Sequence, residues 1–127
     1  MQRMKITAGH QQAMPYLIVE KAEEFIDFIK KIFHAQEMIR KVDTGYKIQL
    51  SEVMIGASTL MLTEASNTYP VQHISMFVYV KDTDQTYYDA LDAGATSLMQ
   101  PMDEDYGARA AGFKDPFGNT WWINTLN

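Results

Sequence analysis

The sequence predicts an α+β protein that contains two tandem β-α-β-β-β modules. Two segments, 19–33 and 82–94, show the spacing of apolar residues that is typical of amphipathic helices. Each segment follows a short apolar run that ends in a valine, Val19 in the first case and Val80 in the second. Three strand-like runs come after each helix, so the same order of elements occurs twice, with a period near half the chain.

In the first half of the chain, "PYLIV" predicts a strand over residues 15–19. The helix predicted at 19–33 has one charged face and one apolar face, which indicates that it packs on a core. The residues of the apolar face are Ala22, Phe25, Ile26, Ile29, Ile32 and Phe33. Three strands with turn residues between them are then predicted at 37–42, 46–55 and 58–64.

In the second half, "HISMFVYV" predicts a strand over residues 73–80. The second helix is expected to begin after Asp82, a suitable N-cap residue, and to end at Gly94. Leu91 is expected to be buried with the apolar face of the first helix. Three strands complete this module, and they are predicted at 96–102, 109–114 and 119–125.

The chain has only two tryptophans, and they are adjacent in the last predicted strand. The segment 115–118, Asp-Pro-Phe-Gly, favours a type I turn that closes a hairpin between the seventh and eighth strands. Because side chains alternate along a strand, Trp121 belongs to one face and Trp122 to the other. We expect Trp121 in the core and Trp122 in a cleft. The alternatives for Trp122 are a dimer contact or a plug in the cleft.

The strand face that carries Trp122 differs in composition from the aliphatic face that carries Trp121. It combines hydroxyl groups, aromatic rings and methionine, a mixture that is typical of small-molecule clefts. The sequence therefore predicts a ligand-binding face on the strands, on the side opposite the helices. The residues assigned to it are Tyr16, Met61, Ser75, Phe77, Tyr79, Trp122 and Asn124.

Composition restricts the possible partners and locations. The 127 residues are 46% hydrophobic, which is enough for one packed core, and the net charge of −5 argues against nucleic-acid binding. The absence of cysteine excludes disulfides and thiolate chemistry. No apolar run approaches the length of a membrane span, so a cytoplasmic protein without membrane contact is expected.

The duplicated order of elements, "AGA" at 93–95 and "DPFGN" at 115–119 resemble the vicinal oxygen chelate superfamily, in particular its small bacterial glyoxalase-like branch. That superfamily contains glyoxalase I, bleomycin-resistance proteins and extradiol dioxygenases. The resemblance implies mixed, curved sheets around a cleft, and a homodimer with the cleft at or near the subunit interface. It implies an N-terminal extension at 1–13 and one domain at 14–127, with modules at 14–66 and 73–126.

Metal-dependent members of that superfamily hold a divalent ion through His, Gln or Glu on four strand positions. By resemblance, these positions fall at Met14, Met61, Ser75 and Trp122. A thioether is a soft ligand and suits such an ion poorly, so no metal or other cofactor is expected. An alternative register makes His73 the ligand in place of Ser75, and His73 is the one weak metal candidate.

Two polar residues near the seventh strand are further candidates. Tyr106 and Arg109 are expected at the mouth of the cleft, where Arg109 can hold an anionic group of a ligand. The alternative for Arg109 is a surface salt bridge to one of the nearby acidic residues at 103–105. Glu52 and Glu64 are expected on the strand face opposite Met61, away from the cleft.

The sequence favours two functions, and a metal-free enzyme that uses Tyr or Arg as acid–base groups also stays open. The first is a protein that binds a small, partly aromatic or amphipathic ligand without a catalytic metal. The second is a metal-dependent lyase, isomerase or dioxygenase of the same superfamily. The metal content of the purified protein discriminates between them.

Overall fold

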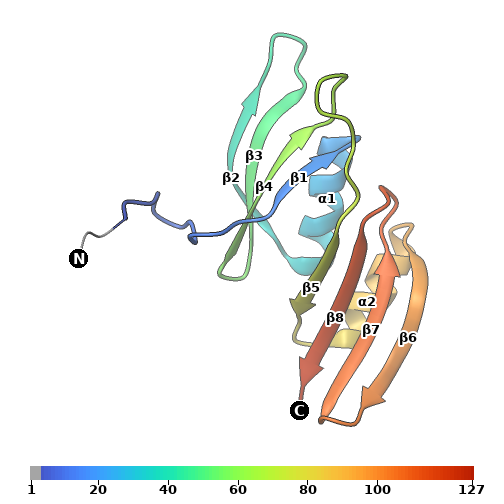
Figure 1. Cartoon of the computed structure of the whole chain (residues 1–127). Helices are drawn as coiled ribbons and strands as arrows, with labels where there is room; N and C mark the ends of the chain where they lie inside the picture. The colour runs from blue at the N-terminus through green and yellow to red at the C-terminus, as the bar shows by residue number, and fades with distance from the viewer. Residues whose placement is uncertain (1–3) are drawn as a thin grey trace.

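The computed structural model describes residues 4–127, and it contains two helices and two four-stranded sheets (Figure 1). The first three residues of the expected N-terminal extension lie outside the described residues. Sheet 1 has the strand order β1-β4-β3-β2 and sheet 2 has the order β5-β8-β7-β6. The first module consists of β1 Tyr16–Val19, α1 Ala22–Phe33, β2 Gln36–Val42, β3 Ile48–Ile55 and β4 Ser58–Glu64.

The second module repeats this order and confirms the predicted α+β fold with tandem modules. It consists of β5 Ser75–Tyr79, α2 Thr83–Asp92, β6 Thr96–Glu104, β7 Ala108–Lys114 and β8 Thr120–Leu126. Strand β5 begins two residues later than predicted, because the Ile74 backbone N–H donates to the side chain of Asn119 instead of a neighbouring strand. Strand β6 extends two residues beyond the predicted end, to Glu104.

Strand pairing shows how closely the modules correspond. In sheet 1, Tyr16 of β1 lies beside Met61 of β4, and the two strands are parallel. In sheet 2, Phe77 of β5 lies beside Trp122 of β8, again in a parallel pair. Each residue of the second pair lies 61 positions after its counterpart in the first. The duplication is therefore structural, and the parallel strand pairs of the two modules keep the same register.

Helix α1 contributes to the packing of both modules. Its residues Phe25 and Phe33 contact Trp121 of β8, with ring centroids 6.4 Å and 5.0 Å apart. Phe28 of the same helix packs edge-on against Phe113 of β7, with ring centroids 6.4 Å apart. It also packs edge-on against Phe117 of the β7–β8 turn, at 6.2 Å. The two modules therefore share one hydrophobic core. Leu91 is only partly buried at its margin, contrary to the prediction, because α2 packs mainly through other residues.

The two helices begin in different ways. Asp82 caps α2 as predicted, with its carboxylate accepting a hydrogen bond from the backbone N–H of Gln85 at 3.1 Å. At α1 the N-cap residue Lys21 supplies no side-chain cap. The carboxylate of Glu64, at the end of β4, instead accepts hydrogen bonds from the backbone N–H groups of Lys21 and Ala22. Glu64 thus lies on the helix side of sheet 1, opposite Met61, as predicted.

The turn at 115–118 is organised by Asp115, whose side chain is buried. Its Oδ1 accepts hydrogen bonds from the backbone N–H groups of Phe117 and Asn119, at 2.8 Å and 2.9 Å. The Gly118 N–H donates to the Asp115 carbonyl, which closes the predicted β-turn between β7 and β8. The remaining carboxylate oxygen accepts a hydrogen bond from the Trp121 indole N–H at 2.8 Å. One side chain therefore fixes both the turn and the first core residue of β8.

Across residues 4–127, neither helix has the length and apolar character needed to cross a membrane.

Candidate functional site

The face of each sheet that is turned away from α1 and α2 is called its open face. On the open face of sheet 2, three aromatic side chains of neighbouring strands are exposed: Phe77 (56%), Tyr79 (65%) and Trp122 (38%). Phe77 and Tyr79 contact each other edge-on, with ring centroids 5.1 Å apart. Phe77 and Trp122 are direct neighbours across β5 and β8. Three of the predicted site residues thus form one aromatic surface, called the aromatic cluster.

Trp122 lies across the sheet because its neighbour on β7 has no side chain. Gly112 is paired with Trp122, and a Cβ atom at position 112 would overlap the indole ring. The glycine therefore lets the ring lie close to the backbone of β7. By contrast, Trp121 is fully buried in the core. The predicted division of the two tryptophans between core and open face is confirmed.

Asn124 and Tyr106 form a polar contact next to the aromatic cluster. The Asn124 side-chain Nδ2 donates a hydrogen bond to the Tyr106 hydroxyl at 2.9 Å. Asn124 is only 1% exposed, and its Oδ1 has no hydrogen-bond partner within the described part of the chain. An unpaired amide oxygen in such a position costs about 1–3 kcal/mol. Asn124 therefore combines deep burial with an unused hydrogen-bond acceptor, and both residues belong to the predicted site.

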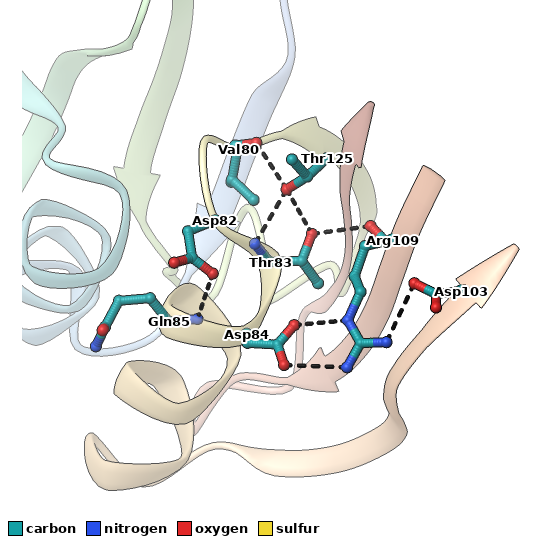
Figure 2. A network of polar contacts seen from close by, with 8 residues as sticks. All are labelled: Val80, Asp82, Thr83, Asp84, Gln85, Asp103, Arg109 and Thr125. Carbon is teal, nitrogen blue, oxygen red and sulfur yellow. Dashed lines mark hydrogen bonds and ion pairs between the residues drawn. The ribbon is translucent and has the colours of Figure 1, made fainter. Parts of the chain in front are cut away.

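Arg109 does not lie at the mouth of a cleft, so this prediction is wrong. It is on the helix side of β7, where its guanidinium donates to both carboxylate oxygens of Asp84 on α2, at 2.8 Å and 3.1 Å (Figure 2). A third hydrogen bond of 3.2 Å joins it to Asp103 of β6. The alternative of a salt bridge to the acidic segment is correct for Asp103. The reason is the alternation of side chains along β7. Gly112 is on the open face with Trp122, so Arg109, three residues earlier, is on the opposite face together with the buried Phe113.

The charges around Arg109 stabilise one another. Hydrogen bonds from Arg109 lower the pKa of Asp84 below its usual value, and hydrogen bonds to Asp84 and Asp103 raise the pKa of Arg109. Figure 2 also shows Thr83 at the start of α2, joined to Thr125 of β8 and to the backbone carbonyl of Arg109. This network connects α2 to three strands behind the aromatic cluster, and it holds β6 and β7 on either side of the turn that carries Tyr106.

On sheet 1, a cavity of about 770 Å³ lies at the end where β2 and β3 are joined. Tyr16 and Ile18 of β1 line it, together with Thr63 of β4 and Tyr69 of the segment between the modules. Tyr16 is the only predicted site residue in its lining. The structure thus divides the predicted strand residues between two open faces. Tyr16 and Met61 are on sheet 1, and the residues on sheet 2 are Ser75, Phe77, Tyr79, Trp122 and Asn124.

The family model described as Glyoxalase/Bleomycin resistance protein/Dioxygenase superfamily matches residues 9–123. The chain belongs to this superfamily. An uncharacterised protein of Mycobacterium bovis is 30% identical over 118 residues, which span 84% of this chain and 78% of that protein. An uncharacterised protein of Mycobacterium tuberculosis is also 30% identical over 118 residues, or 84% of this chain and 69% of that protein.

Solved structures of low sequence identity share the fold. TioX from Micromonospora sp. ML1 has a TM-score of 0.74 at 19% identity, with 92% of this chain and 97% of that chain covered. The PhnB protein from Bacillus cereus has a TM-score of 0.77 at 15% identity, with 91% and 100% covered. These similarities support the glyoxalase-type arrangement of the two modules.

Metal-dependent members of the superfamily require hard ligands, and the residues found here do not fit such an ion. The positions assigned by resemblance hold two thioethers, one hydroxyl and one indole, at Met14, Met61, Ser75 and Trp122. His73 lies outside β5, with its ring against Gly118 of the β7–β8 turn. Within residues 4–127, no three His, Asp or Glu side chains gather in a way that could hold a metal ion.

One partly buried polar pair was missed from the sequence. His10 of the N-terminal extension contacts Glu52 of β3, with Nε2 and Oε1 2.6 Å apart. Glu52 is paired with Met61 across β3 and β4, so the two side chains share the open face. The expectation that Glu52 lies opposite Met61 is wrong. The two-residue turn at 56–57 fixes the pairing of β3 with β4. The length of this turn is the signal in the sequence from which the shared face of Glu52 and Met61 could have been predicted.

Proposed function

We propose that this protein binds a small, planar, partly aromatic or amphipathic ligand, without a catalytic metal, in a cleft built from the open faces of its sheets. The observation that supports this function is the aromatic cluster of Phe77, Tyr79 and Trp122. These rings are exposed side by side on adjacent strands of a sheet whose opposite face is packed. Flat rings of this kind bind planar ligands through stacking and edge contacts.

The proposal includes a C2 homodimer in the cytoplasm. Figure 1 shows the two sheets of one chain displaced from each other, and strands β1 and β5 are each at the edge of a sheet. Apart from one bridge between Gln72 and Ile18 of β1, no other strand within residues 4–127 pairs with these edges. Unpaired edge strands favour further pairing or covering by another chain. A second copy beside these edges brings an open face of sheet 1 together with an open face of sheet 2, and it encloses the ligand between them.

The binding test uses naphthalene-2-sulfonate, a planar probe with one polar group. Titration is followed through the two indole N–H signals in an NMR spectrum, which Trp121→Phe and Trp122→Phe assign. We expect the Trp122 signal to move and the Trp121 signal to stay, because the Trp121 N–H is bonded to Asp115 inside the core. Replacement of Trp122 by Ala should weaken the probe at least about tenfold, as expected for loss of a stacking partner. Binding that leaves the Trp122 signal unmoved would reject the aromatic cluster as the site.

A metal-dependent enzyme is the competing function within the superfamily. Protein purified without chelator should contain no stoichiometric Zn, Ni, Fe or Mn when measured by mass spectrometry. One equivalent of metal that is lost on replacement of His73 by Ala would reject the metal-free function. Probe binding and metal content are independent measurements, so each half of the proposal is tested separately.

A further inference from the structure

Among residues 4–127, Asn124 is the one buried side chain on the open face of sheet 2 that has a polar atom without a hydrogen-bond partner. That atom is Oδ1, while Nδ2 donates to the Tyr106 hydroxyl. Exchange of the two amide atoms does not remove the problem. The Tyr106 hydroxyl would then donate to Oδ1, and Nδ2 would be left without a partner.

The surroundings of Asn124 are small on one side and aromatic on the other. Ala110 of β7 and Tyr79 of β5 are its neighbours across the sheet. Trp122 lies two residues earlier on β8, and residues i and i+2 of a strand are about 7 Å apart on the same face. This separation matches a ligand with two fused rings, which can cover Trp122 with one ring and reach Asn124 with the other.

Tyr106 is the exposed part of this arrangement. It belongs to the short turn between β6 and β7, its side chain is 65% exposed, and its hydroxyl makes the contact with Asn124. Rotation of the ring outward breaks that hydrogen bond and leaves the backbone of the turn in place. Arg109 holds the two strands from the other side of the sheet through Asp84 and Asp103. The frame around Asn124 therefore stays fixed when Tyr106 moves.

We propose that Asn124 is the hydrogen-bonding centre of a subsite that takes a planar ligand with a lactam edge, a ring N–H next to a carbonyl, and that Tyr106 covers this subsite until the ligand binds. An asparagine amide presents one donor and one acceptor side by side. A lactam presents the complementary pair, so its N–H donates to Oδ1 and its carbonyl accepts from Nδ2. This inference rests on the proposed ligand-binding function and specifies the class of ligand.

The test compares two ligands of the same outline, quinolin-2(1H)-one and 2-methoxyquinoline. The second has no N–H donor and no carbonyl. Dissociation constants are measured by NMR from the Trp122 indole signal, and the Asn124 side-chain amide signals report on the subsite itself. We expect the lactam to bind at least about tenfold more tightly, since the methoxy compound has no donor and leaves the buried Oδ1 of Asn124 unpaired. We also expect the Asn124 amide signals to move with the lactam and not with the methoxy compound.

Two variants separate this subsite from general apolar binding. Asn124→Leu keeps the size of the side chain and should abolish the preference for the lactam. Tyr106→Phe keeps the ring but removes the hydroxyl that competes for Nδ2, so the lactam should bind about two- to tenfold more tightly. Because residue 106 is exposed in a turn, this variant remains informative if Asn124→Leu does not fold.

The possible outcomes distinguish failure of the lactam subsite from failure of the proposed ligand-binding function. Equal affinity of the parent protein for the two quinolines, with the Trp122 signal moving in both titrations, would reject the subsite and leave the aromatic cluster as the binding site. A preference that persists in Asn124→Leu would also reject the subsite. Absence of binding by both quinolines rejects the lactam subsite. If naphthalene-2-sulfonate also fails to bind, the proposed function is rejected as well.

Discussion

Two adjacent tryptophans on β8 have opposite environments because a strand alternates its side chains between faces. Trp121 is inaccessible to solvent, it is packed between Phe25 and Phe33, and its N–H is bonded to Asp115. Trp122 lies on the other face over Gly112. The same residue type is therefore part of the core at one position and presents an exposed ring on the open face at the next.

Replacement of Trp121 by Phe should lower the free energy of unfolding by about 2–4 kcal/mol. The substitution leaves a cavity and leaves a carboxylate oxygen of Asp115 without its buried partner. Urea unfolding followed by circular dichroism measures the change. Trp122→Phe is the matched control, and it should change stability by less than about 1 kcal/mol because it lies on an accessible face. Equal losses in the two variants would contradict the division of roles.

Gly112→Ala tests the close approach of Trp122 to β7. The added methyl group overlaps the indole ring, so we expect a loss of about 1–3 kcal/mol and a shifted Trp122 signal. In the background of Trp122→Ala, the same substitution should cost less than about 0.5 kcal/mol, because the ring is no longer there. A cost that is equal in both backgrounds would show that the backbone of β7, and not the ring, requires glycine.

At the scale of elements, most of the fold was predictable, and so was the facing of β1, β4, β5 and β8, but the facing of β3 and β7 was not. Helical spacing, the Asp82 cap and the turn at Asp115 are local signals, and each was confirmed. The facing of Arg109 depends on which residue of β8 lies beside Gly112, and that is a contact between strands. Glu52 was misassigned for a similar reason, although its short hairpin turn does fix the register. The unpaired amide of Asn124 depends on Tyr106, a residue in a distant turn, so only the folded chain reveals it.

Helix α1 provides a test of the shared core. Ile26 is inaccessible to solvent on the inner face of α1, so Ile26→Asp buries an unpaired charge and should unfold the domain. Circular dichroism and the melting curve measure this. Lys31→Asp places the same side chain on the exposed face of the same helix. It should cost less than about 1 kcal/mol, from its unfavourable position near the helix C-terminus. A folded, thermally unchanged Ile26→Asp protein would reject this layout.

The ion pairs of Arg109 predict how stability depends on pH. The pKa of Asp84 is lowered from 3.8 by hydrogen bonds from Arg109, so the charged carboxylate is favoured in the folded state. This contribution is complete above the unfolded value and is lost as pH falls through the lower, folded pKa. Arg109→Gln should therefore be less stable than the parent at neutral pH, and the difference should shrink below about pH 4. Urea unfolding at several pH values measures it, and a difference that does not change with pH would contradict the assignment.

At the scale of the whole molecule, one core connects two sheets, while the residues of the proposed binding site are divided between them. Tyr16 and the cavity beside it are on sheet 1, and the aromatic cluster and Asn124 are on sheet 2. The repeated register of the modules places Tyr16 and Phe77 at equivalent positions. A second copy related by a twofold axis can bring such equivalent surfaces together twice, once at each of two identical clefts. The division of the site within one chain thus leads directly to a prediction about assembly.

We expect a homodimer in solution, with a mass by light scattering of twice the 14.5 kDa of one chain at micromolar concentration. Because a ligand that binds only the assembled cleft favours the assembled state, naphthalene-2-sulfonate should lower the dissociation constant of the dimer. Sedimentation at several protein concentrations, with and without the probe, measures this linkage. Trp122→Ala should retain the dimer in the absence of the probe but lose the effect of the probe. A 14.5 kDa species under all these conditions, with unchanged probe affinity, would show that one chain forms the complete site.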